Sequence, residues 1–166
     1  MGRLEAKVAL VTGTGGGIGR AAATLFAHEG ATVVGCDLHV ARAEETLELV
    51  RGAGGTMTSA APVDLADEDA VRVWIDGAAA EHGGIDVLYN NAGRTSFAPL
   101  ENVTFDDWSF TMRNELDLVF LACKHAWPHL RARGGGSVVN VGSTAGMTGS
   151  LTLQRTAHTA SKGAVI

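Results

Sequence analysis

A glycine-rich segment near the amino terminus has the composition of a turn that binds phosphate. Residues 12–19 read Thr-Gly-Thr-Gly-Gly-Gly-Ile-Gly, between a short apolar run and a stretch with helical apolar spacing. Glycine lets the backbone turn tightly and approach an anion, and the free N–H groups at a helix start then face its charge. The segment by itself could be a plain tight connection. Its place between a strand and a helix favours nucleotide binding.

A carboxylate after the second apolar run bears on which nucleotide is bound. Asp37 directly follows residues 31–36. A carboxylate at this place can accept hydrogen bonds from both hydroxyls of an adenosine ribose, and it repels a 2′-phosphate. Arg42 lies a few residues on, but positions 36 and 38 hold neither Arg nor Lys. The pattern favours NAD(H) over NADP(H), and the alternative is that Asp37 is a solvated turn residue.

Further polar groups follow later apolar runs. Asn90-Asn91-Ala92-Gly93 comes after residues 85–89, Ser143 comes just after residues 137–141, and Ser161-Lys162 closes a His-x-x-Ser-Lys string. The glycine turn alone also fits enzymes that bind a nucleotide sugar or S-adenosylmethionine. These later segments make a methyltransferase the weaker interpretation.

The elements that must position these groups alternate between two apolar periods. Strand-sized apolar runs at 8–11, 31–36, 56–63, 85–89 and 137–141 alternate with amphipathic stretches at about 18–29, 40–51, 68–82 and 105–130. Asp67 and Thr104 stand where N-caps would begin the last two helices. Strict alternation predicts a parallel sheet with helices on both faces. We therefore predict an α/β fold, a doubly wound sheet of Rossmann type, in one domain over residues 1–166.

Two helices carry more specific expectations. In the third helix the spacing places Ala70, Val73, Trp74 and Gly77 on one buried face. In the long fourth helix Pro128 is expected to introduce a kink or end the helix early, because proline lacks the N–H that a helix interior needs.

Composition excludes several classes of protein. The 166 residues have a formal charge of −5, with 46% hydrophobic and 19% charged residues. The acidic balance argues against nucleic-acid binding, and the apolar content against disorder. Apolar runs are too short to span a membrane. Cys36 and Cys123 make neither a disulfide framework nor a metal-ligand pattern, so we expect no metal and a reduced, cytoplasmic setting.

Together these motifs resemble the short-chain dehydrogenase/reductase family over the chain from about residue 5. T-G-x-x-x-G-I-G at residues 12–19, Asn90–Gly93, Ser143 and Lys162 occur in the family's order, each on the expected element. The resemblance implies an oxidoreductase that moves a hydride between NAD(H) and a small alcohol or ketone. It also implies the single-domain Rossmann fold, and the composition adds the expectation of no nucleic-acid or membrane partner.

The resemblance assigns roles residue by residue. The cofactor would contact the glycine turn, the ribose-binding acid, the pair bordering the adenine and the segment after the fourth strand: Gly13, Thr14, Gly17, Ile18, Gly19, Asp37, Asp64, Leu65, Asn91, Ala92, Gly93 and Lys162. Asn91 would also brace the central strand. Asn114 resembles the asparagine that holds a water in the proton relay, or it is a helix-surface amide. Ser143 would hydrogen-bond the substrate oxygen, with Ser137 and Thr144 as alternatives.

The acid/base position departs from the family pattern. The family has Tyr-x-x-x-Lys, whereas here His158 stands four residues before Lys162, and the only tyrosine, Tyr89, lies in a predicted strand. Imidazole can shuttle protons near neutral pH, with an ordinary pKa of ~6.5. It is shorter than a phenol, and a misplacement of ~1 Å can cost ~100-fold in rate. We expect a poor substitute or an impaired or engineered site, and a tenfold or greater gain, about 1.4 kcal/mol, on His158→Tyr.

The second departure is the carboxyl end. The resemblance implies further strands, a longer helix and a substrate-covering loop beyond Ile166, so the chain is expected to be C-terminally incomplete as it stands. An alternative function follows from both departures: an impaired or truncated NAD-binding pseudoenzyme with a binding or assembly role. Apolar residues on the long helix, such as Trp108 and Phe120, lead us to expect a homodimer or homotetramer at full length.

Overall fold

Five parallel strands form the sheet that organises the chain. A computed structural model describes residues 2–149 and 154–166. The strands lie in the order β3-β2-β1-β4-β5. They are β1 (Val8–Thr12), β2 (Thr32–Cys36), β3 (Thr56–Ala60), β4 (Val87–Asn90) and β5 (Ser137–Asn140), and every neighbouring pair is parallel. The order reverses at β1, and ligands of such sheets bind at the carboxyl ends of the strands beside that reversal.

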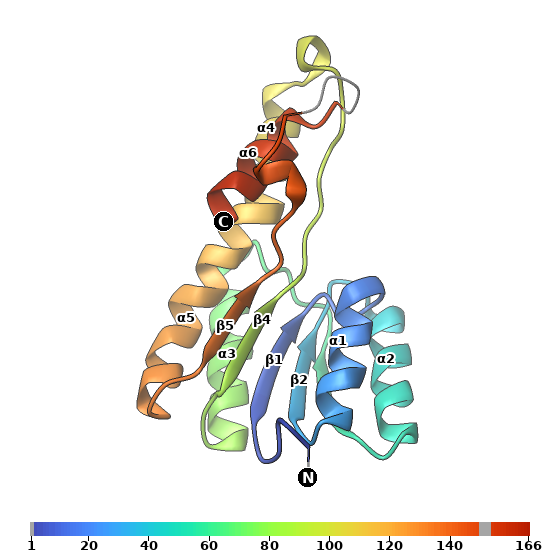
Figure 1. Cartoon of the computed structure of the whole chain (residues 1–166), viewed down its shortest axis with the longest axis vertical. Helices are drawn as coiled ribbons and strands as arrows, with labels where there is room; N and C mark the ends of the chain where they lie inside the picture. The colour runs from blue at the N-terminus through green and yellow to red at the C-terminus, as the bar shows by residue number, and fades with distance from the viewer. Residues whose placement is uncertain (1, 150–153) are drawn as a thin grey trace.

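Helices cover both faces of this sheet, as the alternation predicts. The helices are α1 (Gly17–His28), α2 (Val40–Gly52), α3 (Glu68–His82), α4 (Phe105–Met112), α5 (Leu118–Ala132) and α6 (Thr156–Val165). Short helical turns lie at η1 (Leu100–Asn102), η2 (Arg113–Asp117) and η3 (Thr144–Gly146). Helices α1 and α2 lie on one face and α3 and α5 on the other (Figure 1). The Rossmann-type fold class is confirmed.

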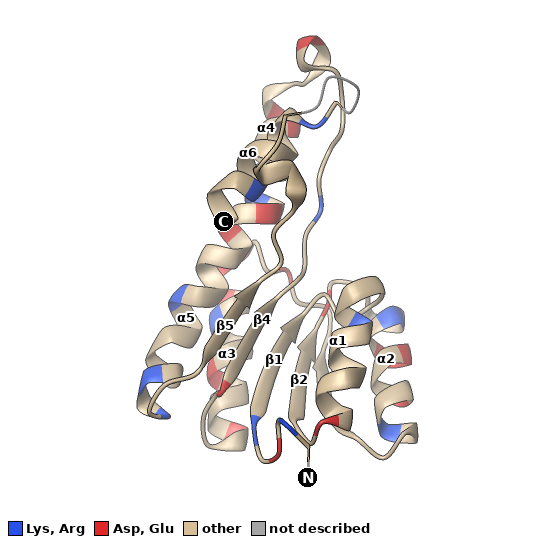
Figure 2. Ribbon diagram, in the orientation of Figure 1, with Lys and Arg blue, Asp and Glu red and all other residues tan. Residues whose placement is uncertain are grey.

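Alternate residues of the central strand enter two separate cores. Val8 and Leu10 pack with the buried side chains of α3 and α5, such as Ile75. Ala9 and Val11 pack with those of α1 and α2. A strand buried on both faces needs apolar residues at every position. The central strand β1 meets this need along most of its length, whereas β3 and β5 carry polar residues and are partly exposed. No strand contains a charged residue, and the charges lie on helices and loops (Figure 2).

One part of the structure rises beyond the carboxyl ends of the strands. This part, called the arm below, comprises the segment 94–104, α4, η2, η3 and α6 (Figure 1). The capping box at the start of α4 confirms Thr104 as its N-cap: the Thr104 hydroxyl accepts from the Asp107 amide at 3.0 Å, and the Asp107 carboxylate accepts from the Thr104 amide at 3.2 Å. Asp67 likewise caps α3, where its carboxylate accepts from the Asp69 amide at 2.9 Å.

Two expectations about strand length and helix face are wrong. β3 ends at Ala60 and not at residue 63, because Pro62 has no N–H to donate to the ladder. In α3, Val73 is 62% exposed, whereas Val71, Trp74 and Ile75 are buried. The helical period alone fits a face with Val73 and Trp74 as well as a face with Val71, Trp74 and Ile75. Contact with α5 and the sheet decides that the face with Val71 and Ile75 is the buried one.

The long helix is also not as expected. A π-helical turn, η2, interrupts it between α4 and α5, while α5 continues past Pro128 to Ala132. The prediction that Pro128 ends the helix early is therefore wrong. One missing N–H costs one hydrogen bond, and the buried face of α5, which includes Ala126 and Leu130, holds the helix on the sheet and α3.

Candidate functional site

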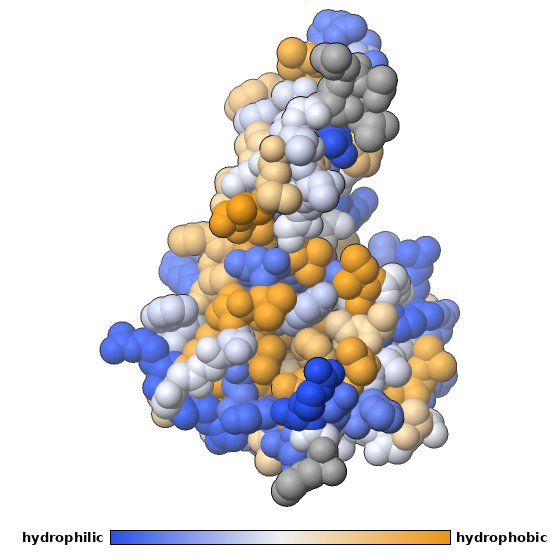
Figure 3. All heavy atoms as spheres, in the orientation of Figure 1, coloured by the Kyte–Doolittle hydropathy of each residue, from blue (hydrophilic) through white to orange (hydrophobic). Residues whose placement is uncertain are grey.

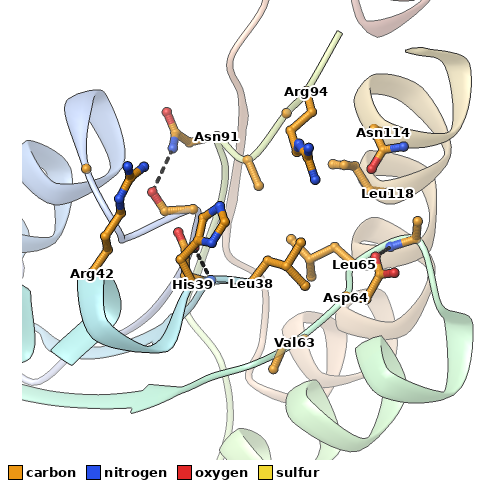
Figure 4. Close-up of a pocket in the computed structure, with 16 residues that line it drawn as sticks. Leu38, His39, Arg42, Val63, Asp64, Leu65, Asn91, Arg94, Asn114 and Leu118 are labelled. Atoms are coloured by element: carbon orange, nitrogen blue, oxygen red, sulfur yellow. Dashed lines mark hydrogen bonds between the residues drawn. The ribbon is translucent and has the colours of Figure 1, made fainter. Parts of the chain in front are cut away.

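A cavity opens where the strand order reverses, at the carboxyl ends of β1 to β4. Its volume is about 450 Å³, within the range of small-molecule sites. Figure 4 shows its lining side chains. The lining residues are Gly13, Gly16, Asp37, Leu38, His39, Arg42, Val63, Asp64, Leu65, Ala66, Asn91, Ala92, Gly93, Arg94, Asn114 and Leu118. Eight of these residues are among those that the sequence proposes for the site.

The glycine turn has the geometry of a phosphate cradle. Gly13 adopts φ +73°, and a methyl group there would lie 2.9 Å from Cα of Ala92. A side chain on Gly19 would overlap the Gly13 carbonyl, so only glycine lets α1 start this close to β1. By contrast, nothing lies within 4 Å of a methyl group placed on Gly16 or Gly17. The start of α1 carries no side-chain cap and no acidic residue, which leaves its N–H groups for an anion.

Asp37 holds this turn in place from the end of β2. One carboxylate oxygen accepts from the Gly15 amide at 2.7 Å, and the other accepts from the His39 amide at 2.8 Å. Each oxygen of a carboxylate has two lone pairs, so both can still accept a ribose hydroxyl. The neighbouring Cys36 points into the core, where burial raises the pKa of its thiol well above the usual value.

Asn91 joins the cavity to the central strand, as expected. Its side-chain amide donates to the Thr12 carbonyl at 3.0 Å, and its backbone N–H donates to the Thr12 hydroxyl at 2.9 Å. On the opposite side of the cavity, the Asp64 carboxylate accepts from the Ala66 amide at 2.9 Å, next to the buried Leu65. Figure 4 shows Asn91 and Asp64 across the opening from each other.

Four predicted cofactor contacts from the turn do not line the cavity: Thr14, Gly17, Ile18 and Gly19. Thr14 is fully buried and its hydroxyl donates to the Cys36 carbonyl at 3.4 Å, so only its backbone could reach a cofactor. Ile18 is 60% exposed. The roles of these four residues stay predictions.

Ser143 and Lys162 lie in and beside the arm, outside the cavity lining. The Ser143 hydroxyl accepts from the Ala145 amide at 3.1 Å and caps η3. The Lys162 ammonium, on α6, donates to the Val141 carbonyl at 2.9 Å. A methyl group on Gly146 would lie 2.6 Å from the Lys162 carbonyl carbon, so η3 and α6 are in close contact. The fold therefore brings the segment after β5 against the helix that carries His158.

Asn114 lies in the π-helical turn, where the cavity meets the arm. Its side-chain amide donates to the Phe110 carbonyl at 2.8 Å, one turn earlier, and the residue lines the cavity beside Leu118. π-Helical turns occur frequently at functional sites. Both expectations for Asn114 thus have a counterpart: a hydrogen bond within the helix and a position at the cavity.

The sequence analysis missed the residue that holds His158. Nδ1 of His158 lies 2.9 Å and 2.8 Å from the two carboxylate oxygens of Glu115, which is only 4% exposed. Ser161 donates to the same carboxylate at 2.6 Å. A signal was present: Glu115 stands at helical spacing from Thr111, Leu118 and Ala122, all buried. A carboxylate on a buried stripe needs a partner.

These residues fit a dinucleotide cofactor and give no sign of a metal. An open glycine cradle at a helix start and a carboxylate at the end of β2 are the features that such a cofactor requires. Among residues 2–149 and 154–166, no group of three or more His, Cys, Asp or Glu could hold a metal ion. Within the same residues, no helix is long and apolar enough to cross a membrane.

Comparison with known proteins gives a consistent result. The family model described as short chain dehydrogenase matches residues 7–166. D-threitol dehydrogenase of Mycolicibacterium smegmatis is 39% identical over 143 residues, which are 86% of this chain and 55% of that protein. The 3-oxoacyl-(acyl-carrier-protein) reductase FabG of Thermotoga maritima is 37% identical over 167 residues, 99% of this chain and 65% of that protein.

Solved structures agree in fold. A short-chain dehydrogenase/reductase from Burkholderia xenovorans superimposes with a TM-score of 0.94 at 37% identity, over 99% of this chain and 66% of that one. A xylitol dehydrogenase with bound NAD⁺ has a TM-score of 0.93 at 32% identity, over 98% of this chain and 62% of that one. The chain thus spans between 55% and 66% of the length of these four proteins.

Proposed function

The chain belongs to the short-chain dehydrogenase family, and from that premise we propose that the complete polypeptide is an oxidoreductase, which transfers a hydride between NAD(H) and an alcohol or ketone. The observation that carries the proposal is the convergence of the glycine turn, Asp37 and Asn91 on one cavity. The relatives are named dehydrogenases and reductases, which does not favour the alternative of a catalytically silent protein.

Residues of the cavity would bind the adenosine and pyrophosphate parts of the cofactor, and residues in and beside the arm would act at the nicotinamide end and on the substrate. The glycine turn would bind the pyrophosphate, Asp37 the adenosine ribose, and Asp64 and Leu65 would border the adenine. The bound cofactor supplies or accepts the hydride. Ser143 would hold the substrate oxygen, Lys162 the nicotinamide ribose, and His158 would move the proton between that oxygen and solvent. Asn114 stands at the junction, where a water of the proton relay could be held.

Asp37 supports NAD(H) as the cofactor. A 2′-phosphate would stand against a carboxylate whose two oxygens are already fixed by backbone amides. Arg42 also lines the cavity and could attract such a phosphate, so the preference depends on which of the two charges is nearer to the ribose. The fixed position of Asp37 at the glycine turn favours the carboxylate.

The test is a fluorescence titration of the complete polypeptide with NADH and NADPH, followed by turnover with a panel of secondary alcohols. We expect tighter binding of NADH and oxidation with NAD⁺. Asp37→Asn keeps the shape and removes the charge, and should lower the NADH preference by about tenfold, equivalent to about 1.4 kcal/mol.

Asp64→Asn is the matched control, because it removes the same charge from the other side of the same cavity. We expect it to leave the ratio of the two dissociation constants unchanged. A wild type that binds NADPH more tightly, or an equal change of the ratio in both variants, would overturn the assignment of Asp37.

A further inference from the structure

The buried carboxylate of Glu115 lies between two groups that can donate hydrogen bonds to it. Nδ1 of His158 lies 2.8 Å from Oε2 and 2.9 Å from Oε1, and the Ser161 hydroxyl lies 2.6 Å from Oε2. The side chains of Glu115 and His158 are 5% and 16% exposed. Taking a carboxylate out of water is costly unless hydrogen bonds and a partner charge or dipole replace the solvent. The contacts with His158 and Ser161 therefore replace solvent around this carboxylate.

These contacts select one tautomer of His158. An ionised carboxylate can only accept hydrogen bonds, so a contact between Nδ1 and such a carboxylate requires the proton on Nδ1. The neutral imidazole then presents Nε2 as its acceptor. Phe97 packs edge-on against the ring, with 5.7 Å between ring centroids, and restrains its rotation from another side. Two neighbours thus act on the ring: Phe97 restrains its orientation, and the Glu115 carboxylate favours the Nδ1–H tautomer.

Glu115 lies directly behind the wall of the cofactor cavity. A methyl group on Gly93, a lining residue, would be 3.8 Å from Cγ of Glu115 and 3.9 Å from its Oε1. The next residue along, Arg94, donates its backbone N–H to the Asn114 carbonyl at 3.1 Å. Asn114 faces the cavity and Glu115 faces α6, so the π-helical turn carries one residue toward each.

We propose that Glu115 is a positioning residue, which holds His158 with its proton on Nδ1 so that Nε2 exchanges the proton of the substrate oxygen. This inference rests on the proposed function, since it needs His158 to serve as the acid/base. In alcohol oxidation the O–H proton goes to Nε2, the C–H hydride goes to NAD⁺, and the C=O bond forms. The imidazolium then releases its proton to solvent, and reduction reverses each step.

The other carboxylate–imidazole contacts among the described residues all involve carboxylates on the surface. Asp76 contacts His129 at 2.8 Å and Glu68 contacts His125 at 3.2 Å, with both carboxylate side chains 50% exposed. Solvent can replace either contact, so neither fixes a tautomer in the way a buried pair does. Asp76→Asn is therefore a matched control for Glu115→Gln.

The experiment combines imidazole nitrogen NMR with kinetics on the complete polypeptide. His158 is identified by the signal that His158→Asn removes, and its tautomer is read without cofactor or substrate. We expect the Nδ1–H tautomer in the wild type and in Glu115→Asp, and a rise of the Nε2–H tautomer in Glu115→Gln. We expect kcat of Glu115→Gln to fall about tenfold or more, within the ~10²–10⁴-fold that acid–base catalysis contributes.

The remaining measurements separate positioning from damage to the fold. Glu115→Asp should regain part of kcat, the dissociation constant for NADH should stay the same in all variants, and Asp76→Asn should keep the wild-type kcat. The positioning role is overturned if wild-type His158 carries its proton on Nε2, or if kcat is unchanged in Glu115→Gln. Turnover by the wild type would still uphold the proposed function in either case. A wild type that does not turn over overturns the proposed function itself.

Discussion

At the residue scale, the pairing of His158 with Glu115 changes what the histidine is expected to do. The sequence presents His158 as a short substitute for tyrosine beside Lys162. In the structure, the ring is within hydrogen-bond distance of the carboxylate of Glu115, a residue that is 4% exposed, and Lys162 donates to the Val141 carbonyl. A buried carboxylate is favourable for an imidazole that gains a proton and unfavourable for a phenol that loses one.

This contact reverses the expectation for His158→Tyr. With Glu115 in place, we now expect turnover equal to or below that of the wild type, because a phenolate would stand beside a carboxylate. Adding Glu115→Gln to His158→Tyr should raise turnover above that of His158→Tyr alone. A double-mutant cycle on kcat measures the coupling, which should reach about 1.4 kcal/mol, or tenfold. A gain of tenfold from His158→Tyr alone would instead support the poor-substitute interpretation.

At the element scale, one buried carboxylate ties three elements together at the far end of the sheet. Asp86, just before β4, accepts from the Val8 amide of β1 at 2.9 Å and from Arg133, which follows α5, at 3.3 Å. Lys7 adds a third contact at 3.3 Å. Burial alone would raise the pKa of Asp86, but the hydrogen bonds from Val8, Arg133 and Lys7 outweigh it and hold the pKa below the usual 3.8.

The depressed pKa of Asp86 predicts a pH-dependent contribution to stability. The contribution is fully present above the unfolded-state pKa and is lost as the pH falls through the lower folded-state value. Asp86→Asn should lower the free energy of unfolding by about 1–3 kcal/mol at about pH 6, and by less at about pH 3. Denaturant unfolding of wild type and variant at both values measures this. Glu45→Gln, which breaks a surface pair with Arg20, should change little at either pH.

The π-helical turn η2 is the element that connects the cavity to the arm. A regular α-helix would carry consecutive residues 100° apart without a break, whereas the extra residue of a π turn changes the phase between α4 and α5. Asn114 and Glu115 lie in this turn, and Leu118 begins the regular helix that packs on the sheet. The turn thus serves both halves of the proposed site.

At the scale of the whole molecule, apolar side chains remain at the surface of the sheet and of the helices α4 and α5. Val139 of β5 is 43% exposed, and Figure 3 shows apolar residues on the same side of the sheet. On α4 and α5, Phe105, Phe120 and Trp127 are 81%, 62% and 57% exposed. Exposed apolar surface marks contacts with other chains where it forms a large patch.

We expect the complete polypeptide to form a homodimer or homotetramer through the face of α4 and α5. Phe120→Lys should shift the mass measured by light scattering toward the monomer at micromolar concentration. Val73→Lys is the matched control, since Val73 has the same 62% exposure on α3, and it should leave the mass unchanged. A monomeric wild type, or equal dissociation in both variants, would contradict this assembly.

The sequence by itself determined the fold class and eight of the residues that line the cavity. Strand-sized apolar runs, glycines at their ends and the residues Asp37 and Asn91 are local signals, because each acts at the end of its own strand. Parallel strands bring their carboxyl ends to one edge, so such residues meet whenever the order of elements is known. The buried face of α3 and the break in the long helix could not be predicted in this way, because packing between elements decides them.

Only the tertiary structure decided how His158 is held. Glu115 and His158 are 43 residues apart, and no periodicity links a π-helical turn to α6. A sequence pattern marks which residues are chemically unusual, here a histidine in a tyrosine position and an acid on a buried stripe. Their contact depends on the packing of η2 against α6, which are far apart in the sequence. Because both polar groups are buried there, each needs the other as a hydrogen-bond partner.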